Sequence, residues 1–216
     1  MFDNIFAASP ITPDALKYFF TNAALKDKSF SPNASLQQIL KFLQAEVYYI
    51  SNQGNWGSYN MPSVLLFAKA DETKFLNGYD EIVLDEFTRL LNKPSQKRPR
   101  YIFIHLMGSH RPYNLRIPEK DIAFKSDFRD HLSYGEECKN QNDELNSYDS
   151  SITYTDKILE KIIKQLKQKK NQPVLFFYFS DHGEVLNATG RDKRTYECTR
   201  QEVFEIPFII WANGKY

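Results

Sequence analysis

The residues with the clearest chemical potential are an aspartate and a histidine that follow a short apolar run. The run 174–179, VLFFYF, is followed by Ser180, Asp181 and His182. A carboxylate and a neutral imidazole are common zinc ligands in proteins. Gly183 supplies a turn, which would let the two adjacent side chains reach one ion. The other interpretation is an aspartate that caps a following helix, beside a partly exposed histidine.

A second candidate is the hydroxyl of Thr12. Thr12, Pro13 and Asp14 predict a helix start, with threonine as the N-cap, proline at the first helical position and then an acid. A hydroxyl at a helix N-terminus lies beside free amide donors and the positive end of the helix dipole, where phosphate binds well. Threonine becomes a good nucleophile only when it is ionised, and zinc coordination can ionise it near neutral pH. A purely structural cap explains the same pattern.

The histidines differ in what their positions allow. His110 follows the apolar run 101–107, YIFIHLM, and could donate to a phosphoryl oxygen or protonate a leaving group, with a plain loop histidine as the alternative. His105 lies inside that run and is predicted to be a satisfied core residue. Glu184 could orient the neighbouring zinc histidine, or it could be a surface acid. His131 lies in a polar segment, and nothing in its position indicates a functional role.

The order of apolar and amphipathic segments predicts an α/β fold with a largely parallel sheet and helices on both faces. The runs 101–107 and 174–179 are nearly continuous in apolar residues, as strands buried on both faces of a sheet are. Ligands bind beyond the carboxyl ends of such strands, where His110, Asp181 and His182 fall. The predicted helices start at Thr12 and Ser35 and span 79–91 and 145–167, and the predicted strands are 46–50, 101–107, 174–179 and 206–211.

Length and composition favour a single globular domain. The 216 residues are enough for one sizeable core, and 42% hydrophobic with 25% charged residues excludes a disordered chain. A net charge of +1 gives no reason to expect nucleic-acid binding. No segment reaches the roughly 18–20 apolar residues of a membrane span, and MFDNIFAASP, which includes Asp3, is not a signal peptide. Cys138 and Cys198 form neither a disulfide framework nor a metal cluster, and they could pair only in an oxidising compartment.

Four sequence segments together resemble one enzyme family. They are YIFIHLMGSHRPYNLR, ELNSYDSSITYTDKILEKII, FYFSDHGEVL and EIPFIIW, in this order. They are similar to the sulfatase-like phosphoethanolamine transferases of Gram-negative bacteria, in the alkaline phosphatase superfamily, which modify lipid A and the lipopolysaccharide core. The combination of H-x-M-G-S-H with S-D-H-G-E is highly specific, and ITPDALKYFFTNA looks most like the branch that modifies core heptose. The resemblance covers nearly the whole chain and implies an alkaline-phosphatase-type fold.

The resemblance implies a role for each candidate residue. Thr12 matches the family's nucleophile, which takes phosphoethanolamine from phosphatidylethanolamine and passes it to lipopolysaccharide, on a core sugar or on lipid A. Asp181 and His182 match two zinc ligands, Thr12 is itself a third, and His110 matches a histidine that holds the phosphate. Zinc and His110 would stabilise the phosphoryl oxygens in both half-reactions. We expect a monomer, and the resemblance implies a place at the periplasmic face of the inner membrane.

The chain departs from the family pattern in several places. The family's remaining zinc ligand is a glutamate on a strand upstream of the threonine, whereas here only eleven residues precede Thr12. The family's membrane helices have no counterpart either, so membrane attachment is expected only through a region that this sequence lacks. A phosphate-side histidine usually follows the S-D-H-G-E loop, and Arg191, Lys193 or Arg194 could take its place as a cation. Residues 1–216 are therefore expected to form a single, incomplete catalytic domain.

Two other functions stay open at this point. The missing glutamate favours an inactive truncated remnant, or a module that binds lipopolysaccharide without turning it over. A sulfatase or phosphodiesterase of the same superfamily is the other alternative, but sulfatases need a cysteine or serine in a C/S-x-P-x-R motif and none lies near Thr12. Metal content would separate the remnant from the transferase.

Overall fold

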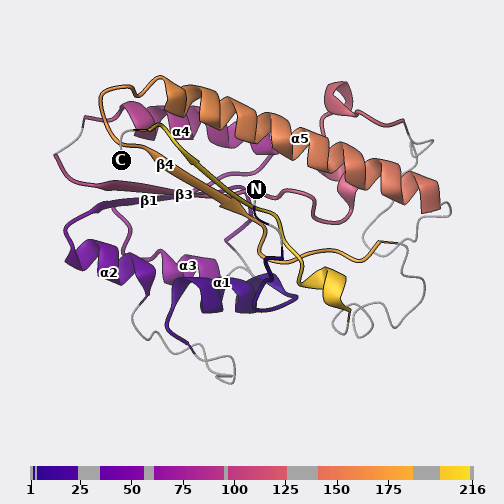
Figure 1. The fold of residues 1–216 in the computed structure, drawn as a ribbon, viewed down its shortest axis with the longest axis horizontal. Coiled ribbons are helices and arrows are strands. Elements are labelled where there is room, and N and C mark those ends of the chain that lie inside the picture. Colours follow the sequence, from indigo (N-terminus) through magenta and orange to yellow (C-terminus); the bar gives the residue numbers. More distant parts are fainter. Residues whose placement is uncertain are drawn as a thin grey trace.

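Helices and strands alternate along the chain (Figure 1). The computed structural model describes residues 2, 4–23, 35–55, 61–94, 97–125, 141–186 and 200–214. The helices are α1 (Thr12–Phe20), α2 (Leu36–Phe42), α3 (Met61–Leu66), α4 (Val83–Asn92) and α5 (Gln141–Lys167), and the strands are β1 (Glu46–Ser51), β2 (Glu72–Phe75), β3 (Arg100–His105), β4 (Leu175–Phe179) and β5 (Phe208–Ala212). Within these ranges, no helix combines the length and the apolar character needed to span a membrane.

The centre of the fold is a parallel sheet of three strands in the order β2-β1-β3. β1 and β3 pair along their whole length, from Glu46 opposite Arg100 to Ser51 opposite His105. Every residue of β1 is buried, because α4 and α5 cover one face of the sheet and α1, α2 and α3 cover the other (Figure 1). The predicted α/β class, with a parallel sheet between helices, is therefore confirmed.

The last two strands form a separate pair. β4 and β5 are antiparallel, with Phe177 opposite Ile210, and among the described residues β4 does not pair with β3. Phe176 and Trp211 pack against the main core, whereas Phe177 is 50% exposed and Ile210 is 40% exposed. The prediction that 174–179 is buried on both faces is wrong, because alternate residues of a strand point to opposite faces and the described elements leave part of the second face open. β3 is likewise only partly buried.

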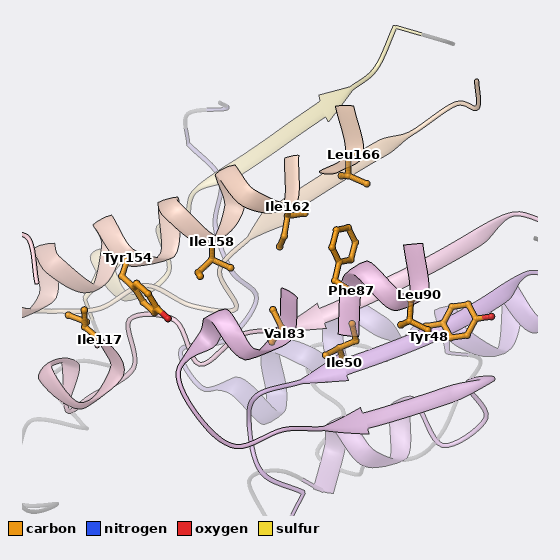
Figure 2. Packing of buried hydrophobic residues seen from close by; sticks show 10 residues of the cluster. All are labelled: Tyr48, Ile50, Val83, Phe87, Leu90, Ile117, Tyr154, Ile158, Ile162 and Leu166. Atoms are coloured by element: carbon orange, nitrogen blue, oxygen red, sulfur yellow. The ribbon is translucent and has the colours of Figure 1, made fainter. Parts of the chain in front are cut away.

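The main hydrophobic core lies between the parallel sheet and the helices α4 and α5. Val83, Phe87 and Leu90 of α4 and Ile158 and Ile162 of α5 are at most 4% exposed. Figure 2 shows the side chains of the two helices pointing toward one another. Each such side chain contributes about 1.5–3 kcal/mol by leaving water. This packing holds both helices on the sheet and so holds the loops that join them to it.

The helix starts predicted at Ser35 and Thr12 are both present, but the N-cap of the second lies one residue earlier than predicted. The Ser35 hydroxyl accepts from the Gln38 amide at 3.2 Å, and the Gln38 side chain accepts from the Ser35 amide at 2.9 Å, which caps α2. Thr12, predicted as the N-cap of α1, is instead its first helical residue, and Ile11 is the N-cap. The reason is that the Ile11 carbonyl already accepts the first helical bond, from the Ala15 amide at 3.0 Å.

Other boundaries differ from the prediction as well. The predicted helix 79–91 begins as the single turn η1 (Asp80–Ile82) and continues as α4, and the predicted helix 145–167 begins earlier, at Gln141. Neither α3 nor β2 is among the predicted elements. α3 has only six residues, and β2 has no fully buried residue, so neither carries an apolar pattern long enough to predict.

The core packing predicts a loss of stability when a buried side chain of α5 is shortened. Ile158→Ala removes a side chain that is 0% exposed, and we expect the free energy of unfolding to fall by about 2–5 kcal/mol. The control on the same helix is Ile152→Ala, because Ile152 is 45% exposed; it should change stability by no more than about 0.5 kcal/mol. Urea denaturation followed by circular dichroism measures both. Equal losses in the two variants would contradict this packing.

Candidate active site

The loops that follow β3 and β4 bring together three of the predicted site residues. His110 lies in the loop after β3, and Asp181 and His182 lie in the loop after β4. Desolvation lowers the pKa of His110 below its ordinary value, and the hydrogen bond to the Arg111 carbonyl and the carboxylate of Asp181 oppose this shift. Arg111, which directly follows His110, donates to the Val185 carbonyl at 2.8 Å, so the loop that carries His110 lies against the loop that carries Asp181 and His182.

Asp181 and His182 form the centre of this site. His182 Nε2 lies 3.8 Å from Asp181 Oδ2. That carboxylate oxygen is buried and has no hydrogen-bond partner among the described residues. A buried polar atom without a partner is costly, and a cation held between the oxygen and the ring nitrogen would remove that cost. The two donors therefore suit a metal ion.

The backbone at Gly183 orients the histidine. His182 Nδ1 lies 2.7 Å from the Gly183 carbonyl oxygen; because a carbonyl only accepts, Nδ1 carries the proton and Nε2 keeps its lone pair for a ligand. Gly183 is tightly packed, since its amide donates to the Val203 carbonyl at 2.7 Å and a Cβ would lie 2.3 Å from the Glu202 carbonyl oxygen. Glycine is needed here for close approach, and its φ is not in the left-handed region.

Arg111, which is absent from the predicted site, ties the two loops together. Its guanidinium donates to the Val185 carbonyl and to the Tyr113 hydroxyl, both at 2.8 Å. It also lies 3.6 Å from Glu184 and 3.5 Å from Glu144, near the start of α5. Glu184, a predicted candidate for orienting the zinc histidine, is therefore an ion-pair partner of this arginine.

The other two histidines of the β3 region have separate roles. His110 Nδ1 lies 2.6 Å from the Arg111 carbonyl, and Arg116 donates to the His110 carbonyl at 3.2 Å. The Nε2 edge of His110 is thus the part of the ring that can face a substrate. His105 Nδ1 lies 2.9 Å from the Tyr49 hydroxyl, and burial lowers its pKa. His105 is therefore hydrogen-bonded, as predicted, but it is only partly buried and not a core residue.

The N-terminal segment lies beside residues 203–206, which support the site turn. The Ile206 amide donates to the Ile5 carbonyl at 3.0 Å, and the Ala7 amide donates to the Phe204 carbonyl at 2.7 Å. One residue before Phe204, the Val203 carbonyl accepts from the glycine amide of the site turn. The segment 203–206 therefore joins the N-terminal residues to the loop that carries the candidate metal ligands.

Thr12 follows this N-terminal segment in the chain. It begins α1 five residues after Ala7 (Figure 1). The N-cap of α1 is Ile11, which makes no side-chain capping hydrogen bond, and among the described residues no hydrogen bond or ion pair links Thr12 to Asp181 or His182. The structure thus brings the loop that carries His110 against the loop that carries those two residues.

The described residues do not complete a metal site from acids, cysteines and histidines alone. Within these ranges, no group of three or more such residues is placed to hold an ion. Asp181 and His182 supply two donors, and a four-coordinate zinc would need further ligands of other residue types or from other segments. Some predicted residues lie outside the described residues: His131, Cys138, Arg191, Lys193, Arg194 and Cys198.

Comparison with known proteins identifies the family to which this fold and site belong. The sulfatase family profile matches residues 1–216, which is the whole chain. The chain belongs to the sulfatase family.

Relatives of this sulfatase-family chain are phosphoethanolamine transferases. It is 29% identical over 231 residues to phosphoethanolamine transferase EptC of Escherichia coli (strain K12), covering 100% of this chain and 39% of that protein. It is 32% identical over 214 residues to phosphoethanolamine transferase EptA of Helicobacter pylori (strain ATCC 700392 / 26695), covering 91% of this chain and 39% of that protein. The chain therefore spans about two fifths of the length of these relatives.

A solved structure has the same fold as the sulfatase-family chain. It is the C-terminal periplasmic domain of EcEptC from Escherichia coli in complex with Zn, with a TM-score of 0.82, 25% identity and coverage of 99% of this chain and 62% of that chain. The predicted resemblance to the sulfatase-like phosphoethanolamine transferases, and the alkaline-phosphatase-type fold that it implies, are confirmed.

The packing of the site turn predicts that a methyl group cannot be added to its glycine. We expect Gly183→Ala to lower the free energy of unfolding by about 1–3 kcal/mol, because the new Cβ would overlap a carbonyl oxygen. Gly78→Ala is the control, since its Cβ would meet only the Ile82 side chain, at 3.4 Å. Thermal denaturation of both variants measures the difference in stability between them. A Gly183→Ala chain as stable as the Gly78→Ala chain would show that the turn is loosely packed.

Proposed function

We propose that this chain is the catalytic part of a phosphoethanolamine transferase. It moves phosphoethanolamine from phosphatidylethanolamine to lipopolysaccharide, on a core sugar or on lipid A. The observation that carries the proposal is the buried, unpartnered Oδ2 of Asp181 beside Nε2 of His182. This pair suits a cation in a chain whose relatives are phosphoethanolamine transferases. The choice of a core sugar rests on the sequence resemblance.

Thr12, Asp181 and His182 are the chain's own candidates for holding zinc. Asp181 Oδ2 and His182 Nε2 lie close enough to one another to share an ion, and Thr12 would add its hydroxyl oxygen. Bound zinc would lower the pKa of a coordinated hydroxyl and withdraw electron density from a phosphoryl oxygen. By family resemblance, a glutamate from a segment outside this sequence would complete the ligand set.

The transfer takes two steps in this proposal. The hydroxyl oxygen of Thr12 attacks the phosphorus of phosphatidylethanolamine, the P–O bond to diacylglycerol breaks, and the diacylglycerol oxygen takes a proton. A hydroxyl or phosphate oxygen of the acceptor then attacks the same phosphorus. The P–O bond to Thr12 breaks in this second step, which restores the free threonine.

His110 serves both steps by binding the phosphoryl group. In its protonated form it donates from Nε2 to a phosphoryl oxygen, while Nδ1 stays on the Arg111 carbonyl. Because desolvation lowers the pKa of the free side chain, a negatively charged phosphate nearby is what would favour the protonated form. His110 is thus expected to take up a proton as the phosphoryl group binds.

The relatives support a proposal for where the reaction takes place. The matched EcEptC structure is a periplasmic domain. We place the chain at the periplasmic face of the inner membrane, as a monomer, with attachment supplied by a region outside this sequence. Sulfate-ester hydrolysis is not proposed despite the family's name, because no C/S-x-P-x-R motif lies near Thr12.

An inactive remnant, or a module that binds lipopolysaccharide without turnover, is the second candidate. The observation that favours it is the lack, within the described ranges, of three acids, cysteines or histidines placed around one ion. Weak zinc binding would leave Thr12 without activation. Metal content separates this candidate from the transferase.

Zinc stoichiometry tests the proposed site directly. Elemental analysis of the purified chain should find about one zinc per chain, and His182→Ala and Thr12→Ala should each lose it, because each removes one of the three ligands that this chain itself would supply. Asp85→Ala is the control, since Asp85 is an exposed carboxylate on α4, outside the site; it should keep the metal. Absence of zinc from the unsubstituted chain, even at micromolar supply, would favour the remnant. Zinc that survives His182→Ala would place the metal elsewhere.

A further inference from the structure

A buried carboxylate outside the metal-ligand pair holds the loop that carries His110. Asp80, in the turn η1, is 3% exposed. Its Oδ1 accepts from the Met107 amide and from the Asn52 side-chain amide, both at 2.8 Å. Its Oδ2 accepts from the Gly108 amide at 2.7 Å. A carboxylate that accepts from backbone amides makes short, strong bonds, so residues 107 and 108 are held firmly.

The support behind Asp80 is itself tied to the sheet and to α5. The Asn52 side chain also donates to the Gly78 carbonyl at 2.8 Å, and the Asn52 amide donates to the His105 carbonyl at 2.8 Å. The amide of Glu81 donates to the Tyr154 hydroxyl of α5 at 3.1 Å. Asp80 is therefore fixed by its neighbours on the sheet and on α5, and its hydrogen bonds fix the position of the loop in turn.

Gly108 is the point at which the loop turns. Its φ is +58°, in the left-handed region, and a Cβ there would meet nothing within 4 Å. Glycine is thus required by the backbone conformation and not by crowding. Because the Gly108 amide is bonded to Asp80 Oδ2, the carboxylate holds the turn two residues before His110.

We propose that Asp80 is a positioning residue that presents His110 to a phosphoryl group at the Asp181–His182 site. The inference rests on the proposed function and identifies the residue that holds His110 in place for its contact with the phosphate. A carboxylate is needed because both oxygens accept. An asparagine at position 80 would have one accepting oxygen and would turn its NH₂ group toward a donor.

The experiment compares inorganic phosphate binding in Asp80→Asn and Asp85→Asn. Asp85 is an exposed carboxylate five residues along the chain, so Asp85→Asn controls for the loss of one negative charge. Backbone amide shifts in ¹⁵N–¹H NMR spectra report phosphate affinity and, at Met107 and Gly108, the loop bonds. We expect Asp80→Asn to shift both amides upfield and to weaken phosphate binding about tenfold, since a hydrogen bond to a charged group is lost. Asp85→Asn should match the unsubstituted chain.

A double substitution separates positioning from general destabilisation. If Asp80 acts through His110, Asp80→Asn should weaken phosphate binding no further in a His110→Gln background. Gly108→Ala is the second variant, for the case that Asp80→Asn does not fold; it should also weaken phosphate binding, because it strains the same turn.

The proposal is overturned if Asp80→Asn keeps full phosphate affinity, if the loss is equal in the His110→Gln background, or if the unsubstituted chain binds no phosphate. In the case that Asp80→Asn does not fold, full phosphate affinity in Gly108→Ala overturns it. Phosphate binding that depends on Asp80 and His110, in a chain whose Thr12 never carries phosphoethanolamine, would support the positioning role and reject the transferase.

Discussion

The in-register pairing of β1 with β3 is the constraint on which the candidate site depends. Ser51 lies opposite His105 at the carboxyl ends of the two strands, so the chain leaves both strands at the same edge of the sheet. The first residue after β1, Asn52, donates to the His105 carbonyl and to the Asp80 carboxylate. A slip of one residue would turn the side chains of β3 to the opposite face and move the loop that carries His110.

The apolar packing and the unpaired polar group lie in different parts of the fold. β1 is buried along its whole length, and the cluster formed by α4 and α5 secures one face of it. After β4, which belongs to the separate antiparallel pair, Asp181 keeps a buried oxygen without a partner among the described residues. Such a group costs about 1–3 kcal/mol, which the core must offset. A cation bound at this oxygen would remove that cost.

The local sequence pattern predicted those elements and residues whose signal lies within a few neighbouring positions of the chain. Continuous apolar runs marked β3, β4 and β5, and the S-D-H-G-E and H-x-M-G-S-H motifs marked Asp181, His182 and His110. The separate antiparallel pairing of β4 with β5, and the half-exposed face that results, depend on which strands meet in space. A run of apolar letters does not carry that information.

The supporting residues were missed for a related reason. Asp80 acts through amides 27 and 28 positions away, and Arg111 reaches a carbonyl 74 positions away. In the sequence, Asp80 is an acid at a helix start, and Arg111 is a basic residue beside a histidine. Their function exists only once the loops after β1, β3 and β4 are assembled.

The most direct measurement is the mass of the Thr12-containing peptide from zinc-loaded chain incubated with phosphatidylethanolamine. The account predicts a phosphoethanolamine adduct on Thr12, absent in His182→Ala and lost when lipopolysaccharide is added. An unmodified Thr12 in chain that holds its zinc would contradict it, because the metal would then be bound without activating the nucleophile.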